Sequence, residues 1–449
     1  MGSAVHVEDL RFGFAPTIDP APGIDPVGDA KALIASATPS PAPTPTPGTI
    51  VLHHNAGRRF VLRIPDEWNG ALVAAGTPGI RSEFANDAIW SETALARGYA
   101  FASSNKGIPF NVIAETNDGL ASPHAAYPVP FAAPGSEGST KGFRFGVLSP
   151  HPVGIAAWNE DFRHLVEFAR GVLRVRRDAL PRRTYAVGFS NGGGQVRSAL
   201  ERFPELIDGG VEYAGVRWTP QRSILDFLPP FLAAMPAYVR SGFTDPVARA
   251  AIEALGFPCD VLQPENPAHP SLWCDNYLLY SDLTLFVFAL LIDPQATAFW
   301  SGDPAEPDAD DPQRLPGIVR GEGLARPELR ASYIPSDHAR AAIKAFAHTG
   351  AIERPLISLA GTKDAFIHPD FHAVGYAQAV ADAGRARLHR LYLIENATHA
   401  DSFADFGYGL QSCWPFAWAA FDQLVRTVEQ GDIRGLGTTR SVTKATQIP

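Results

Sequence analysis

The feature that most constrains the fold is a short central stretch in which a β-strand pattern runs directly into a helix pattern. Residues 184–189, Thr-Tyr-Ala-Val-Gly-Phe, have the β-branched and aromatic composition of a strand. Ser190 follows, and after it apolar residues recur at helical spacing, at Val196, Ala199, Leu200 and Phe203. Gly188 and Gly192 flank the serine and lack the Cβ atoms that would clash in a sharp bend. The pattern therefore predicts an exposed Ser190 hydroxyl on a tight strand-to-helix turn.

A serine in this position is suited to nucleophilic attack on a carbonyl carbon. The N–H of Asn191 would open the helix, where the helix dipole favours the negative charge that develops on the carbonyl oxygen. We expect a second N–H donor from residues 76–79, Gly-Thr-Pro-Gly, which follow a buried-strand pattern. Pro78 has no N–H, so Thr77 is the first choice and Gly76 the alternative. Both segments also have a purely structural interpretation. Residues 76–79 could be a plain turn, and the glycines around Ser190 could serve only to let a helix pack close to a strand.

Nucleophilic serines need a base that takes the hydroxyl proton and an acid that orients the base. His399 lies in a loop directly after residues 390–394, a late strand pattern, and shortly before a C-terminal helix pattern. Asp364 comes soon after residues 355–360, another buried-strand pattern. Loops at the carboxyl ends of strands are where open α/β sheets build their sites. We therefore predict His399 as the base and Asp364 as the acid.

Other residues are weaker candidates for these roles. His368 is the alternative base, although its position four residues after Asp364 favours a loop neighbour over a partner for Ser190. Asp370 and Asp401 are the alternative acids, whereas Glu395 ends its strand too early to reach the histidine. For substrate binding the candidates are Gly76, Phe189 and Trp218.

The order of the patterns predicts the architecture. Strand and helix patterns alternate through residues 49–216 and again through 349–449, which predicts a doubly wound, mostly parallel α/β sheet. Residues 1–48 are rich in proline and are expected to form an extended arm. Residues 217–348 are crowded with apolar and aromatic side chains and are predicted to form an inserted, mainly helical lid. The same side chains could instead fill the insert's own core.

Two further stretches are expected to be irregular. Residues 105–152 are rich in glycine and proline and nearly without periodicity, so we expect a long loop that borders the substrate entrance or simply crosses the surface. The tail after about residue 431 is expected to be disordered.

Composition excludes several classes of protein. The net charge of −9 and a pI near 5.8, with no cluster of Lys or Arg, argue against a nucleic-acid partner. The longest apolar run, residues 285–292, is too short to span a bilayer. The acidic residues 306–311 lack the ligand spacing of a calcium loop, and we expect no metal or cofactor. Localisation stays open: periplasmic or secreted if a signal peptide has been removed, otherwise cytoplasmic.

The three cysteines suggest little cross-linking. Cys259 and Cys274 are close enough in sequence to form a local disulfide, and the alternative is that both are free thiols. Cys413 begins a helical pattern and is expected to be a buried thiol.

Several motifs together resemble bacterial serine esterases of the α/β-hydrolase superfamily, of the tannase-like and 3-hydroxybutyrate-oligomer-hydrolase-like kinds. They are Gly-Phe-Ser-Asn-Gly-Gly-Gly-Gln at 188–195, Trp-Asn-Gly at 68–70, Ala-Gly-Thr-Pro-Gly at 75–79, Ala-Arg-Gly-Tyr-Ala at 96–100 and Ser-Asn-Lys-Gly at 104–107. The resemblance covers roughly residues 60–216 and 350–430. In this superfamily the chain order is serine, acid, histidine, which Ser190, Asp364 and His399 follow. Tannases carry cysteines where this chain has Phe189 and Thr398, which argues against gallate-ester specificity.

The sequence therefore predicts a serine hydrolase that cleaves a small or oligomeric carboxylic ester, with a hydrophobic, aromatic or hydroxyacid group, through an acyl-enzyme. Two alternatives remain. The same triad could cleave amides or transfer the acyl group to an alcohol, or the fold could serve as a non-catalytic binding protein. The natural ester and the oligomeric state are left open.

Overall fold

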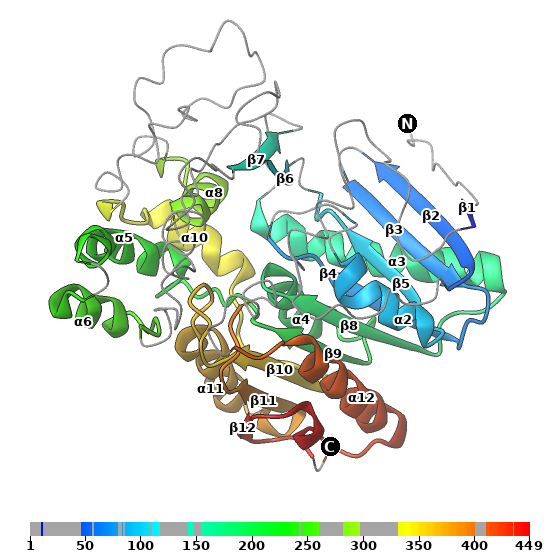
Figure 1. Ribbon diagram of the computed structural model, residues 1–449. Coiled ribbons are helices and arrows are strands. Elements are labelled where there is room, and N and C mark those ends of the chain that lie inside the picture. The colour runs from blue at the N-terminus through cyan, green and yellow to red at the C-terminus, as the bar shows by residue number, and fades with distance from the viewer. Residues whose placement is uncertain are drawn as a thin grey trace, which may run out of the picture.

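A ten-stranded sheet forms the centre of the molecule in the computed structural model (Figure 1). The structure describes residues 10–11, 46–55, 58–79, 83, 86–107, 110–116, 142–147, 154–241, 244–259, 282–296, 331–399, 410–433 and 435–449. The strand order is β1-β2-β3-β5-β4-β8-β9-β10-β11-β12. The strands are β1 (Leu10–Arg11), β2 (Gly48–Asn55), β3 (Arg58–Pro65), β4 (Ala71–Gly76), β5 (Ala100–Ser104), β8 (Arg183–Phe189), β9 (Gly209–Tyr213), β10 (Leu356–Gly361), β11 (His389–Ile394) and β12 (Thr439–Val442).

The sheet is parallel from β5 to β12 and antiparallel from β1 through β3 to β5. The predicted mostly parallel sheet is confirmed, and β2 and β3 form an antiparallel hairpin at its start. Within β4 the side chains alternate between two cores, because Ala71, Val73 and Ala75 pack on one face of the sheet and Leu72 and Ala74 on the other. Burial on both faces explains why the strand reads as a continuous apolar run.

Helices cover both faces of the sheet. The longer ones are α3 (Ile155–Arg177), α4 (Asn191–Arg202) and α12 (Trp414–Gln430). Shorter helical segments are η1 (Asp87–Ser91), α2 (Glu92–Ala96), η5 (Asp370–Val374), α11 (Gly375–Asp382), η6 (Ala386–Leu388) and η8 (Ala445–Gln447). One core contains residues of α2 and α12, and the other contains residues of α3 and α4. None of the described helices is both long enough and apolar enough to cross a membrane.

Four described helices lie between β9 and β10 in the chain: α5 (Ile224–Arg240), α6 (Pro246–Ala254), α8 (Asp282–Ile292) and α10 (Asp337–Phe346). They group together at one end of the molecule (Figure 1). The apolar side chains of α5 that suggested a lid are buried in a core shared with α3, namely Phe227, Leu228, Phe231, Leu232 and Met235. For these side chains the structure favours the interpretation that they fill the insert's own core. A lid function of residues 217–348 stays a prediction.

Two regions expected to be irregular contain strands. Within residues 105–152, β6 (Phe110–Thr116) and β7 (Gly142–Val147) form an antiparallel pair, so the expectation of a structureless loop was wrong. The expected disordered tail was also wrong, because β12 pairs in parallel with β11. Only Val442 of β12 is buried, so this edge strand is held chiefly by its backbone and leaves no apolar pattern in the sequence.

Other expectations fall partly outside the described residues. In the N-terminal arm, Leu10–Arg11 pairs with Thr49 and Ile50 of β2, while residues 12–45 lie outside them. Cys259 is buried, and Cys274 lies outside the described residues, so the bridge between them stays untested. Cys413 is fully buried at the start of α12, as expected.

Candidate active site

Ser190 occupies the turn between β8 and α4, as the glycine pattern predicts. Its backbone has φ 57° and ψ −122°, in a region that residues other than glycine seldom adopt. The turn is held from the next strand, because the Ser190 N–H donates a 2.9 Å hydrogen bond to the carbonyl of Tyr213. A Cβ built on Gly188 would lie 2.3 Å from the Gly192 carbonyl oxygen, so no larger residue fits there. The bend therefore presents the serine at the carboxyl end of β8.

The structure brings Ser190, His399 and Asp364 into one hydrogen-bonded chain. The His399 Nε2 atom lies 3.2 Å from Ser190 Oγ, and His399 Nδ1 lies 2.9 Å from Asp364 Oδ2. All three side chains are buried. With the proton of a neutral imidazole on Nδ1, that nitrogen donates to Asp364 and leaves Nε2 free to accept the serine proton.

The carboxylate of Asp364 is fixed by its own loop. Its Oδ1 atom accepts the N–H groups of Phe366 at 2.9 Å and Ile367 at 2.8 Å. Its other oxygen, Oδ2, is thus directed toward His399. Aromatic rings surround the imidazole, with ring centroids of Phe189 and Phe366 at 4.8 and 5.4 Å from that of His399.

The candidate oxyanion donors differ in their surroundings. Asn191 is the first residue of α4, where helix geometry gives the N–H no intrahelical acceptor. The Thr77 N–H, in contrast, donates to Gln195 Oε1 at 3.1 Å, and Gln195 Nε2 donates to the Trp158 carbonyl at 2.8 Å. The Thr77 amide could therefore bind an oxyanion only in exchange for Gln195. Gly76 lies against the backbone of Gly192 at the same junction.

The remaining candidates lie away from Ser190 or outside the described residues. His368 packs against Phe227 and Phe257 in the insert, with ring centroids 4.8 Å apart in both cases. Trp218 is buried against Phe288 and Phe346, so the structure does not bring its indole to Ser190. Asp370 is exposed at the start of η5, Glu395 pairs its N–H with Val442, and Asp401 lies outside the described residues.

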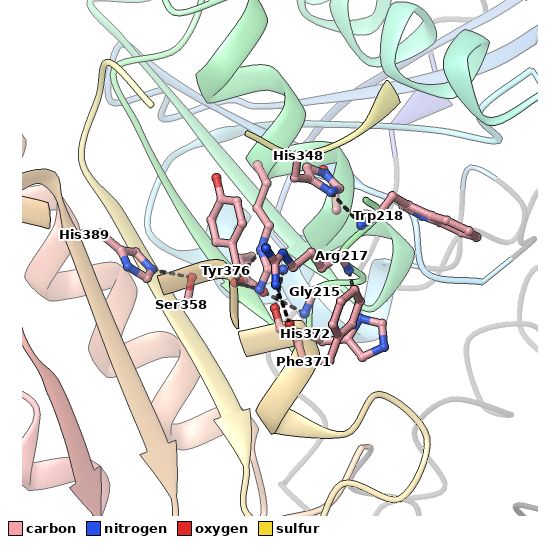
Figure 2. A network of polar contacts seen from close by, with 12 residues as sticks. Gly215, Arg217, Trp218, His348, Ser358, Phe371, His372, Tyr376 and His389 are labelled. Atoms are coloured by element: carbon pink, nitrogen blue, oxygen red, sulfur yellow. Dashed lines mark hydrogen bonds and ion pairs between the residues drawn. The ribbon is translucent and has the colours of Figure 1, made fainter. Parts of the chain in front are cut away.

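A buried polar network beside α4 was not predicted from the sequence. Arg197 and Glu212 form an ion pair in which both side chains are fully buried, with Nη2 2.6 Å from Oε1. Arg197 also donates through Nη1 to the carbonyl of His372, at 2.7 Å. Glu212 uses its second oxygen to accept the N–H of Gly215. Helix α4, strand β9 and segment η5 are thereby linked, and Figure 2 shows Gly215 and His372 together in this network.

His348 makes a second link from α4 to the insert. Its Nδ1 atom accepts the N–H of Trp218 at 3.1 Å (Figure 2). The neutral ring therefore donates from Nε2 to the Gly194 carbonyl at 2.9 Å. Burial lowers the pKa of His348 to about 4, which keeps this ring neutral at pH 7. The sequence carries no motif that would identify either link, because each residue is a single polar side chain with partners distant in the chain.

Lys106 is buried next to the loop that contains Thr77. Its Nζ atom donates to the carbonyl of Gly79 and lies 4.7 Å from the ring centroid of Trp158. Burial lowers the pKa of Lys106 well below its usual value, while the nearby Asp161 opposes this effect. Burial also raises the pKa of Asp161, to about 7. Among the described residues, no group of three or more His, Cys, Asp or Glu side chains is arranged to hold a metal ion.

The sheet is mostly parallel, Ser190 lies on a strand-to-helix turn, and the acid and the histidine follow it in that order. The fold is that of an α/β hydrolase.

Comparisons with known proteins give only distant similarities. No family model and no curated protein matches the chain. Among solved structures, it is similar to feruloyl esterase B from Aspergillus oryzae, with 14% identity, a TM-score of 0.43, and 89% of this chain and 85% of that chain covered. It is also similar to an esterase from Aspergillus oryzae, with 11% identity, a TM-score of 0.47, and 96% of this chain and 86% of that chain covered. A third similar structure is the tannin acyl hydrolase from Aspergillus niger, with 14% identity, a TM-score of 0.39, and 88% of this chain and 80% of that chain covered.

Proposed function

We propose that this protein is a carboxylic-ester hydrolase that acts through an acyl-enzyme on Ser190. The observation that carries the proposal is the hydrogen-bonded chain from Ser190 Oγ through His399 to Asp364. The three residues come from distant parts of the sequence, yet each supplies the group that acyl transfer needs.

In the first half of the reaction, Ser190 Oγ attacks the ester carbonyl carbon while His399 Nε2 takes the hydroxyl proton. Asp364 holds the imidazole in the required tautomer and stabilises the imidazolium that forms. The Asn191 N–H, at the start of α4, donates to the oxygen on which negative charge develops. His399 then gives the proton to the departing alkoxide, and the acyl group stays on Ser190.

In the second half, water takes the place of the alcohol. His399 removes a proton from this water, which attacks the acyl carbon, and the carboxylic acid leaves as Ser190 recovers its proton. The ring of Phe366, partly exposed beside His399, favours an apolar group on the substrate, in agreement with the hydrophobic or aromatic ester expected from the sequence. The ring of Phe189, a predicted substrate-binding residue, is instead buried in the core against Tyr213 and Trp414.

The proposal is tested with Ser190→Ala and a series of p-nitrophenyl esters of increasing acyl length. We expect kcat/KM to fall by about 10⁴-fold or more, because the nucleophile is lost. Ser198→Ala is the matched control: Ser198 lies buried on the same helix, 3.2 Å from His348 Nε2, and does not contact the triad. Its activity should stay within a few-fold of wild type. Equal turnover by Ser190→Ala and wild type would refute the proposal.

The same enzyme preparation separates the alternative reactions. Matched ester and amide substrates, with and without an alcohol acceptor, would show whether hydrolysis of esters is the preferred reaction. A purely binding role requires that wild-type protein form no covalent adduct on Ser190 with a fluorophosphonate.

A further inference from the structure

Tyr213 contacts the backbone next to two of the proposed catalytic side chains. It is the last residue of β9 and is fully buried. Its carbonyl oxygen accepts the N–H of Ser190 at 2.9 Å. Its hydroxyl donates to the carbonyl of Thr398, the residue that precedes His399. One side chain and its own backbone thus connect the nucleophile turn to the histidine loop.

A third segment joins at the same hydroxyl. Cys413, at the start of α12, lies with its Sγ 2.8 Å from the Tyr213 hydroxyl oxygen and 3.4 Å from the Thr398 carbonyl oxygen. The Tyr213 hydroxyl can accept from the thiol and donate to the carbonyl, so both polar atoms of this buried contact are satisfied. The histidine loop is therefore attached at residue 398 to both β9 and α12.

The ring of Tyr213 also packs against Phe189, next to Ser190. Its centroid lies 5.8 Å from that of Phe189, the residue before Ser190, and the Phe189 centroid lies 4.8 Å from that of His399. A continuous chain of contacts through Tyr213 and Phe189 thus runs from the turn at Ser190 to His399.

We propose that Tyr213 is a positioning residue, whose hydroxyl holds the histidine loop so that His399 Nε2 faces Ser190 Oγ. This inference rests on the proposed function. Without the hydroxyl the Thr398 carbonyl loses its strongest donor, and the loop can move relative to β8. Displacements of about 1 Å in such a group can lower a rate by about 10²-fold.

The test compares Tyr213→Phe with Tyr392→Phe. Tyr213→Phe keeps the ring and the bond from Ser190 N–H to the residue 213 carbonyl, and removes only the hydroxyl. Tyr392 is equally buried on β11, and its hydroxyl donates to Gln423 Oε1 at 2.9 Å, away from the triad. Tyr213→Phe loses the bond to Thr398 and the one from the Cys413 thiol, and Tyr392→Phe loses the bond to Gln423, so both should unfold at a lower urea concentration than wild type.

We expect the two variants to differ in catalysis. Tyr213→Phe should lower kcat for a p-nitrophenyl ester by about 10- to 100-fold with KM within about threefold, whereas Tyr392→Phe should keep kcat within about twofold. Tyr213→Phe/Cys413→Ala should lower kcat further, because the thiol can no longer substitute as a donor to Thr398. Equal kcat values for Tyr213→Phe and Tyr392→Phe would overturn the inference.

A second measurement needs no substrate. The proton between His399 Nδ1 and Asp364 should give a downfield NMR resonance that is absent in His399→Asn. We expect this resonance to broaden or shift in Tyr213→Phe and to be unchanged in Tyr392→Phe. An unchanged resonance in Tyr213→Phe would refute the positioning role. If wild type hydrolyses no ester, the proposed function fails, and the resonance still decides whether Tyr213 positions His399.

Discussion

Removing one partner of the buried Arg197–Glu212 pair should be the most destabilising charge change in this part of the fold. Both side chains are fully buried. Arg197 reaches Glu212 Oε1 from Nε at 3.1 Å and Nη2 at 2.6 Å, and it reaches the His372 carbonyl from Nη1 at 2.7 Å. Arg197→Met breaks all three contacts and leaves the Glu212 carboxylate buried without its cation. An unpaired buried charge of this kind costs about 3–5 kcal/mol of unfolding free energy.

A matched control separates the effect of burying an unpaired charge from the effect of losing an exposed ion pair. Arg249 and Glu253 form a pair at 2.9 Å on α6, with exposed fractions of 46% and 44%. Pairs this exposed contribute about 0.3–0.5 kcal/mol, so Arg249→Met should hardly change stability. The expected difference between the two variants is therefore about 2.5–4.7 kcal/mol.

Urea unfolding measures this difference when tryptophan fluorescence and far-UV circular dichroism give coincident transitions. The double variant Arg197→Met/Glu212→Gln should be less destabilised than the sum of the single variants, because neither partner is then left as an unpaired charge. The reasoning is refuted if Arg197→Met loses less than about 1 kcal/mol, or if the two single losses simply add.

Three further predictions concern one buried histidine and two glycines. The ring nitrogens of His368 have no hydrogen-bond partner among the described residues, and burial, with a smaller effect of Arg222, lowers its pKa to about 3. Between pH 6.5 and 3 the unfolded chain therefore binds a proton that the folded chain does not, so stability decreases as the pH is lowered, by about 2 kcal/mol at pH 5. His368→Phe should recover this amount in urea unfolding at pH 5 relative to pH 8, and an equal effect at both pH values would contradict it. A Cβ on Gly171 of α3 would meet nothing within 4 Å, so Gly171→Ala should raise the unfolding free energy by about 0.5–1 kcal/mol. A Cβ on Gly192 would lie 2.1 Å from the Gly76 carbonyl oxygen, so Gly192→Ala should lower both stability and esterase activity, and a neutral result would contradict this packing.

The parts of the fold that could be predicted are those in which one physical rule acts on neighbouring residues. Burial on both faces makes β4 a continuous apolar run and makes β10 apolar except for Ser358, and the sequence shows both strands directly. The turn at Ser190 is also local, because a φ of 57° and the close approach of Gly188 to Gly192 leave few residues that fit. The carboxyl ends of β10 and β11 lie side by side in a parallel sheet, which is why Asp364 and His399 could be paired from the sequence.

The rest depends on contacts between single polar residues that are far apart in the chain. Tyr213 and Thr398 are 185 residues apart, and Thr77 and Gln195 are 118 residues apart. Neither pair belongs to a periodic pattern, so hydrophobic spacing carries no information about them. Thr77, the candidate for the second oxyanion donor, illustrates the consequence: the sequence identifies its loop, but only the structure places Gln195 Oε1 as the acceptor of its N–H.

Helix α4 shows why such distant contacts accumulate next to Ser190. After Asn191 it continues with Gly192, Gly193 and Gly194, and each glycine in a helix interior costs about 1 kcal/mol relative to alanine. The glycines are required by packing, since a Cβ on Gly193 would lie 2.7 Å from the Gly215 Cα. A segment with so weak an intrinsic preference for the helical conformation must be stabilised by contacts with neighbouring elements. Gln195 and Arg197, within two turns of Ser190, supply those contacts to β9, α3 and η5. The Asn191 N–H can therefore stay aimed at one point because the surrounding fold, and not the helix's own propensity, fixes the start of α4.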